Sequence, residues 1–169
     1  MYNTRVLFKI LEFEVLLDST NLLPKDWIYI ATKIEENYDD YDSFIILHGT
    51  DTMAFTGSAL SFMLENLAKT IVISGSQIPL SESRNDAFDN LMGSLMIAGH
   101  FTIPEVLIYF RDKLLRGNRC KKVDSISLNA FDSPNAPPLG VAGICFKFRD
   151  DLLLKLPDSE FKVMKNMNT

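Results

Sequence analysis

The sequence predicts an α/β domain built on a mostly parallel β-sheet flanked by helices. Three short apolar runs have the length and the bounding turn residues of buried strands: Phe44–Leu47, Thr70–Ser74 and Pro104–Phe110. Between them, residues 53–69 and 83–99 carry apolar side chains at helical spacing. Strands that alternate with helices at these intervals form parallel βαβ units with right-handed crossovers.

A further strand and helix are expected before these units. Residues 5–17 favour β-structure, with Glu12 and Glu14 in alternation near the end. A turn-forming cluster follows at residues 18–21, and Pro24 stands near the start of a helix predicted over about residues 25–38. The buried face of that helix is expected to contain Trp27, Ile30, Ala31 and Ile34.

The regular alternation ends after Phe110. A central Gly-Asn and four cations in residues 114–123 indicate a hairpin or an irregular pair of strands. Residues 133–140 form a Pro-rich surface loop, and residues 141–148 predict one last strand. Beyond Asp150 the chain is charged, as in a linker or a ragged terminus.

Composition and charge narrow the function classes. Of the 169 residues, 47% are hydrophobic and 23% are charged, an ordinary balance for one globular domain. The formal charge is −5 and the pI is near 5.0. No basic run extends beyond residues 116–122, so nucleic acid and membrane surfaces have weak support as partners. Since no apolar stretch could span a bilayer and the start is unlike a signal peptide, we expect a cytoplasmic protein.

Cysteine and histidine usage predicts neither a metal site nor a cofactor. Cys120 and Cys145 are too few for a disulfide framework or a set of metal ligands. His48 and His100 have no second His or Cys at ligand spacing. A generic nucleotide-binding domain is disfavoured, because no Gly-rich phosphate loop follows a strand.

The strongest candidate for a site is Thr50-Asp51, directly after the run Phe44–Leu47. Ligands of open α/β sheets bind beyond the carboxyl ends of the strands. The helix predicted from Met53 would direct free backbone N–H groups and its positive dipole to the same place. This layout favours a small polar, partly anionic ligand. Two further polar clusters lie at strand ends or in loops: Asp18-Ser19 and Lys121-Lys122.

A threonine, a lysine and an aspartate can form a triad with the logic of Ser-His-Asp. The lysine takes the hydroxyl proton if its pKa is depressed by burial or by another cation. A carboxylate orients that lysine, although its charge opposes the neutral form. Structural interpretations remain open beside this one: Asp18 and Ser19 as a turn and a cap, Lys121 and Lys122 as a solvated hairpin, and His48 as a strand-end histidine bonded to backbone.

Several segments together resemble L-asparaginases, the amidohydrolases that convert asparagine to aspartate and ammonia. The motifs are Leu11-Glu-Phe-Glu, Leu17-Asp-Ser-Thr-Asn21, His48-Gly-Thr-Asp-Thr-Met53, Ser61-Phe-Met-Leu-Glu-Asn66, Gly75-Ser-Gln-Ile-Pro79, Arg116-Gly-Asn-Arg119, Lys122-Val-Asp124, Ser133-Pro-Asn135 and Pro138-Leu139. They extend over residues 5–150 and are ordered as in the cytosolic (type I) branch, whose animal members carry ankyrin repeats further on.

The resemblance implies a Rossmann-like or flavodoxin-like N-terminal asparaginase domain and a role for each matching residue. Thr50 resembles the second active-site threonine, Lys122 its proton partner, and Asp51 the third member of the triad. Asp51 also resembles the carboxylate that holds the α-ammonium group of the substrate. Asp18 and Ser19 match the family's substrate-binding pair, with Ser19 suited to the α-carboxylate. The implied substrate is L-asparagine, without a cofactor, and the full-length form is expected to be a homo-oligomer.

One departure from the family concerns its first catalytic loop. The family begins with a strand leading to a Thr-Gly-Gly-Thr-Ile-Gly loop, which has no counterpart in this sequence, and Thr4 has no Gly neighbours. We therefore expect residues 1–150 to be an N-terminal domain that is incomplete at its start, with an exposed sheet edge and a half-built pocket. Residues 151–169 would be a linker or the start of the absent C-terminal domain. The alternative to an active enzyme is an inactive, truncated homologue that binds amino acid or an oligomeric partner.

Overall fold

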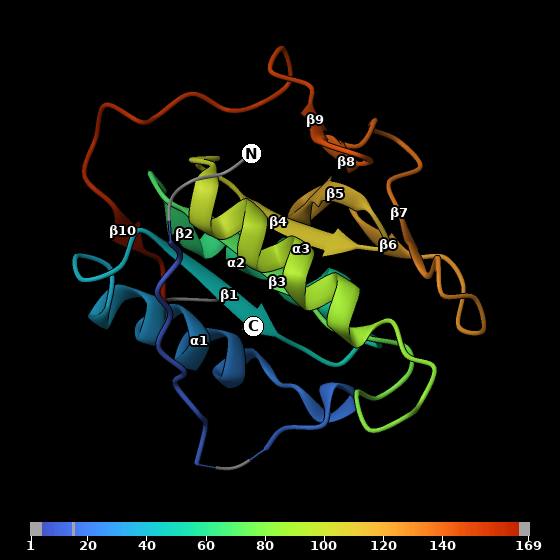
Figure 1. Ribbon diagram of the computed structural model, residues 1–169. Coiled ribbons are helices and arrows are strands. Elements are labelled where there is room, and N and C mark those ends of the chain that lie inside the picture. Colours follow the sequence, from blue (N-terminus) through green and yellow to red (C-terminus); the bar gives the residue numbers. More distant parts are fainter. Residues whose placement is uncertain (1–4, 15, 166–169) are drawn as a thin grey trace.

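A six-stranded sheet forms the centre of the molecule (Figure 1). The computed structural model describes residues 5–14 and 16–165. The strands follow across the sheet in the order β1 (Ser43–Leu47), β3 (Thr70–Ser74), β4 (Val106–Phe110), β5 (Lys113–Arg116), β8 (Gly140–Ala142) and β9 (Phe146–Phe148). β1, β3 and β4 are parallel to one another, and the remaining neighbours are antiparallel. The predicted α/β class is confirmed, with a parallel core of β1, β3 and β4 to which β5, β8 and β9 are added in antiparallel pairs.

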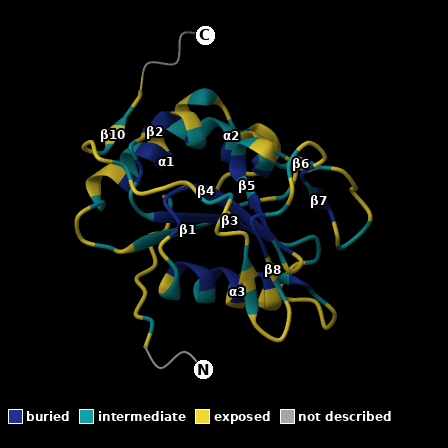
Figure 2. Cartoon of the chain, turned by 90° about the horizontal axis from the view of Figure 1, so that it is seen from above, coloured by how far each residue is buried: buried dark blue, intermediate teal, exposed yellow. Residues whose placement is uncertain are grey.

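Helices cover both faces of this sheet. They are α1 (Pro24–Glu36), α2 (Met53–Met63) and α3 (Ala87–His100). Figure 2 shows α1 and α2 on one face and α3 on the other. Side chains of β3 alternate accordingly: Ile71 and Ile73 join the core under α1 and α2, while Val72 packs with Ile97 of α3. Among the described residues, no helix has both the length and the apolar character needed to cross a bilayer.

Shorter elements connect the helices and strands. They are η1 (Ser19–Asn21), β2 (Leu64–Glu65), η2 (Gly117–Arg119), β6 (Lys121–Lys122), β7 (Phe131–Asp132) and β10 (Lys162–Val163). Arg111 and Asp112 have positive φ angles of 45° and 64° and form the tight turn between β4 and β5. The strands expected within residues 114–123 do not pair with each other, because β5 pairs with β4 and β8 whereas β6 pairs with β7.

Two helices are shorter than their apolar patterns predicted. α2 ends at Met63 instead of continuing to residue 69, because the next two residues form β2 and Asn66 takes a positive φ of 55°. α3 begins at Ala87 instead of residue 83, because the carboxylate of Asp86 accepts hydrogen bonds from the loop after β3. Prediction and structure agree closely for α1 and β3.

The strand predicted for residues 5–17 is wrong for the described part of that segment, and Val15 lies outside the described residues. Three of its apolar side chains are largely exposed: Leu7 (80%), Phe8 (68%) and Ile10 (70%). Phe13 packs edge-on against Tyr29, with 5.0 Å between the ring centroids. A strand requires a hydrogen-bonding neighbour and a half-buried surface, and β-favouring composition alone supplies neither. β1 forms one edge of the sheet, with β3 as its strand partner among the described residues.

Two segments after β5 form further strand pairs with the rest of the domain. A hairpin of β8 and β9 replaces the single strand predicted for residues 141–148, because the chain reverses at Gly143–Cys145. Further on, the ring of Phe161 stacks on that of Tyr38 with 3.8 Å between centroids, and β10 pairs with β2. Residues 161–163 are therefore packed against Tyr38 and β2.

A buried ion pair connects the sheet to this last segment. Glu105, whose side chain is 3% exposed, accepts hydrogen bonds from Nε and Nη2 of Arg116 and from the backbone N–H of Leu154. Arg116 also donates to the carbonyl oxygen of Leu152 at 2.6 Å. The two charged side chains thus bind each other and also form hydrogen bonds with the backbone N–H of Leu154 and the backbone carbonyl of Leu152.

We expect Glu105→Ala to lower the free energy of unfolding by about 3 kcal/mol, because it leaves the Arg116 guanidinium without its buried partner. Equilibrium urea denaturation measures this change. Asp151→Ala is the control, since Asp151 pairs with Arg149 on the surface and its side chain is 61% exposed. Equal unfolding midpoints for Glu105→Ala and Asp151→Ala would contradict the structural role of the buried pair.

Candidate functional site

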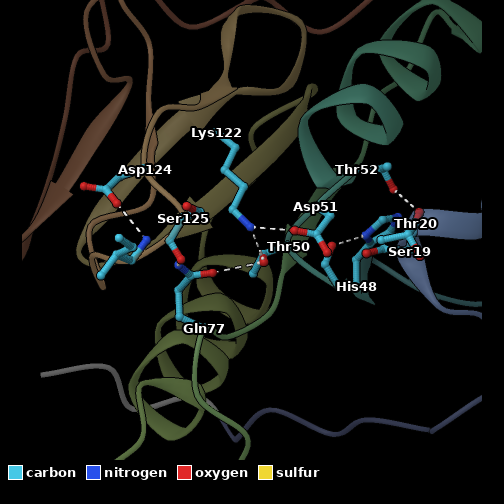
Figure 3. A network of polar contacts seen from close by, with 12 residues as sticks. Ser19, Thr20, His48, Thr50, Asp51, Thr52, Gln77, Lys122, Asp124 and Ser125 are labelled. Carbon is cyan, nitrogen blue, oxygen red and sulfur yellow. Dashed lines mark hydrogen bonds and ion pairs between the residues drawn. The ribbon is translucent and has the colours of Figure 1, made fainter.

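Thr50, Asp51 and Lys122 meet at the carboxyl end of β1 (Figure 3). Thr50 and Asp51 form the turn between β1 and α2, and Lys122 belongs to β6. Nζ of Lys122 lies 2.8 Å from Oγ1 of Thr50 and 2.8 Å from Oδ1 of Asp51. The Lys122 side chain is 18% exposed and that of Asp51 is 56% exposed. A largely enclosed ammonium group therefore links a hydroxyl to a carboxylate that remains open to solvent.

Lys122 reaches the turn because the segment before it packs on α2. A Cβ at Gly117 would lie 2.9 Å from the carbonyl oxygen of Gly57, so glycine at position 117 allows the close approach of η2 to α2. β6 then pairs with β7, which places Lys122 opposite the buried Phe131. The interpretation of both lysines as a solvated hairpin holds for Lys121, which is exposed, whereas Lys122 is half-buried.

Gln77 is a member of the cluster that the sequence did not single out. The Thr50 hydroxyl donates to Oε1 of Gln77 at 3.0 Å. Nε2 of Gln77 donates to the carbonyl oxygens of Ser125 and Ser127 at 3.2 and 3.1 Å. The sequence contained a signal for this residue: Gln77 lies in the loop that follows β3, and parallel strands end at the same edge of a sheet.

Ser19 and Asp18 lie close to the same turn but make different contacts. The carbonyl oxygen of Ser19 accepts a hydrogen bond from the Thr52 hydroxyl at 2.6 Å, and the buried Ser19 side chain lies against Gly49. Figure 3 shows Ser19 beyond Asp51, on the side away from Lys122. Asp18 is exposed, and its Oδ1 accepts the N–H of Thr20 at 3.0 Å as the cap of η1. The interpretation of Asp18 as a cap is therefore confirmed, and Ser19 is joined to the turn through Thr52.

His48 connects the turn to α1 and α2 through hydrogen bonds. Nδ1 lies 2.6 Å from the carbonyl oxygen of Gly49, and Nε2 lies 2.8 Å from Oγ1 of Thr56. Trp27 Nε1 donates to the same Oγ1 at 2.9 Å. Since a carbonyl can only accept, we assign the proton to Nδ1, so that Nε2 accepts from the Thr56 hydroxyl. Burial lowers the pKa of His48 and favours this neutral form, which agrees with the interpretation of His48 as a strand-end histidine bonded to backbone.

A hollow of about 320 Å³ lies at the carboxyl ends of β1 and β3, and Asp18, Ser19, Thr50, Asp51 and Lys122 are not part of its lining. Its lining includes Leu47, Gly49, Gly75 and Leu80. Gly75 makes the close approach of the two strand ends possible, because a Cβ there would overlap the carbonyl oxygen of His48. Hollows of roughly this size accept small molecules. No group of three His, Cys, Asp or Glu residues within the described ranges could hold a metal ion.

Comparison with known proteins identifies the family of this chain. The family described as "Asparaginase, N-terminal" matches residues 3–153, which include the five predicted site residues: Asp18, Ser19, Thr50, Asp51 and Lys122. The chain belongs to the asparaginase family. The resemblance inferred from the motifs is thereby confirmed.

Two curated relatives and one solved structure illustrate how far the similarity of this asparaginase domain extends. L-asparaginase of Dirofilaria immitis is 48% identical over 153 residues, which are 90% of this chain and 26% of the relative. L-asparaginase 1 of Escherichia coli K12 is 53% identical over 137 residues, 81% of this chain and 40% of the relative. The crystal structure of L-asparaginase I from Vibrio cholerae superimposes with a TM-score of 0.88 and 49% identity, covering 94% of this chain and 48% of that one. The chain thus spans between about a quarter and a half of these relatives.

We expect the free energy of unfolding to decrease as the pH is lowered below 6.5, the ordinary pKa of histidine. His48 is expected to cause part of this decrease. Burial lowers the pKa of His48 in the folded state, so the unfolded state binds more protons in the interval below 6.5. The contribution of His48 is therefore complete above 6.5 and is lost as the pH falls towards its folded-state pKa. Urea denaturation between about pH 7.5 and 5 should give a shallower pH dependence for His48→Gln than for the wild type. Identical slopes for the two proteins would contradict the buried, neutral imidazole.

Proposed function

We propose that this domain supplies the threonine, lysine and aspartate of an amidohydrolase that converts L-asparagine and water to L-aspartate and ammonia. The observation that supports this function best is the position of Lys122 Nζ, 2.8 Å from both Thr50 Oγ1 and Asp51 Oδ1. One lysine in contact with a hydroxyl and a carboxylate has the connectivity of a nucleophile, its proton acceptor and the group that orients it.

In the proposed reaction, Lys122 in its neutral form takes the proton of the Thr50 hydroxyl. Oγ1 of Thr50 attacks the side-chain amide carbon of asparagine, the C–N bond breaks, and Lys122 returns the proton to the departing ammonia. Water then hydrolyses the acyl-enzyme and regenerates Thr50. A direct attack by water, activated by the same lysine, gives the same products. Both routes require donors for the developing oxyanion.

Recognition of the amino acid is assigned to the rim of the same turn. The Asp51 carboxylate, 56% exposed, suits an α-ammonium group, and the N-terminus of α2 favours an anion. Ser19 is proposed for the α-carboxylate, with Asp18 as its neighbour in the substrate-binding pair. We further propose that the full-length protein is a cytoplasmic homo-oligomer that needs no cofactor, with residues 1–150 as its N-terminal domain and residues 151–169 leading towards the C-terminal domain.

The second candidate is a chain that binds the amino acid without turnover. The observation that favours it is that the sequence contains no Thr-Gly-Gly-Thr segment. In this case the polar cluster would retain its charges and hydrogen bonds while a second nucleophilic group is missing.

Ammonia release from L-asparagine by the purified chain tests the first candidate. We expect Thr50→Val to abolish release, because it removes the hydroxyl while conserving the shape of the side chain. Lys122→Met should lower the rate by about 10²- to 10⁴-fold, the usual contribution of a positioned acid or base. Thr102→Val, at an exposed threonine, is the matched control and should retain the wild-type rate.

The same preparations separate the two candidates. Wild-type turnover no higher than that of Thr50→Val rejects the hydrolase for this chain. If L-asparagine nevertheless raises the thermal unfolding temperature of the wild type and not of Asp51→Asn, the binding function stands.

A further inference from the structure

Two buried polar residues near the start of α3 lie outside the cluster of Thr50, Asp51 and Lys122. Asp86 is 1% exposed and Asn90 is 2% exposed. They are four residues apart, so both side chains lie on one face of the helix, and Nδ2 of Asn90 donates to Oδ2 of Asp86 at 3.1 Å. Polar side chains are buried to this extent only where their hydrogen bonds are satisfied.

The Asp86 carboxylate binds the backbone of the loop that follows β3. The N–H of Gln77 lies 3.1 Å from each of its two oxygens, and the N–H of Ile78 donates to Oδ1 at 2.9 Å. Hydrogen bonds to a carboxylate are roughly twice as strong as those between neutral groups. Asp86 thus binds the backbone N–H groups of Gln77 and Ile78, and Gln77 is the residue whose side chain contacts Thr50.

Asn90 holds the same loop and a second one. Its Nδ2 donates to the carbonyl oxygen of Gly75 at 2.9 Å, and its Oδ1 accepts the N–H of Arg111 at 3.0 Å. Gly75 and Arg111 directly follow β3 and β4. Asp86 and Asn90 therefore bind the chain on both sides of Ser76 and attach it to α3 and to the turn after β4.

The side chain of Gln77 connects this loop to the cluster of Thr50, Asp51 and Lys122. Its Oε1 accepts the Thr50 hydroxyl, while its Nε2 is bound by the carbonyl oxygens of Ser125 and Ser127. The orientation of the Thr50 hydroxyl hydrogen thus depends on where the Gln77 backbone is held. Apolar packing does not determine that position, because residues 75–78 are only half-buried.

We infer that Asp86 and Asn90 are positioning residues that hold the Gln77 carboxamide against the Thr50 hydroxyl. They act through the backbone of residues 75–78 and touch none of the groups assigned to substrate. An effect of Asp86 and Asn90 on turnover rests on the proposed function, whereas their effect on the position of Gln77 does not.

NMR spectroscopy of the full chain without substrate tests the inference. The reference is Thr50→Val, which removes the hydroxyl donor and shifts the Gln77 carboxamide resonances. We expect Asp86→Asn to shift the same resonances in the same direction and to accelerate hydrogen exchange at the Gln77 and Ile78 amides by about tenfold or more. Amides of Ile73 and Leu107, in the core strands, should exchange as in the wild type. Asp89→Asn makes the same charge change at an exposed position of α3 and should alter neither signal.

Unshifted Gln77 resonances in Asp86→Asn overturn the inference, and so does faster exchange that extends equally to Ile73 and Leu107. If Asp86→Asn does not fold, Asp86→Glu replaces it: the carboxylate is kept one methylene further out, so the Gln77 resonances must move while Ile73 and Leu107 stay protected. Resonances at the wild-type positions in Asp86→Glu overturn the inference as well.

Turnover separates this inference from the proposed function. A wild-type chain that releases no ammonia rejects the hydrolase, and the substrate-free spectra still decide the role of Asp86. If the wild type is active, Asp86→Asn should lower the rate in the wild-type background and have no further effect in Gln77→Ala. Additive losses would show that Asp86 acts independently of Gln77 and would overturn the inference.

Discussion

Parallel pairing of β1 with β3 is the constraint from which the geometry of the site follows. Because parallel strands end at the same edge of a sheet, the turn at Thr50 and the loop at Gln77 become neighbours although 27 residues separate them. The pairing also brings the carbonyl oxygen of His48 so close to Gly75 that a side chain there would collide with it. Both the hydroxyl of Thr50 and its acceptor are thus placed by backbone hydrogen bonds in the core of the fold.

The two edge strands of the sheet, β1 and β9, have different surroundings. On one side, the β8–β9 hairpin ends the sheet and is covered by aromatic contacts such as that of Phe101 with Phe148, at 4.6 Å between centroids. On the other side, β1 is the outermost strand among the described residues, and the N-terminal segment exposes Leu7, Phe8 and Ile10. A sheet edge without a further strand in the described part of the chain, and exposed apolar side chains such as these, favour association with further polypeptide.

Buried polar groups join segments that hydrophobic packing alone would leave loosely defined. Glu105 links β4 and β5 to residues 152–154, Thr56 links α1 to the end of β1, and Asp86 links α3 to the loop after β3. Each of these groups has its hydrogen bonds satisfied, so each favours one relative position of the segments it connects. By contrast, the pair of Arg149 and Asp151 is exposed and two residues apart, and it constrains little beyond its own turn.

The sequence by itself determined the α/β class, the position of β3 to the residue, and the family, because apolar periodicity and turn residues are local properties. It also located Thr50 and Asp51 at a strand end, since that position follows from the run before them. Only the tertiary structure decided that residues 5–14 form no strand, that Lys122 turns inward while Lys121 faces solvent, and that Gln77 completes the cluster. Each of these outcomes depends on neighbours distant in the chain: a strand needs a partner, a lysine needs a surface to cover it, and a carboxamide needs a backbone held in place by Asp86.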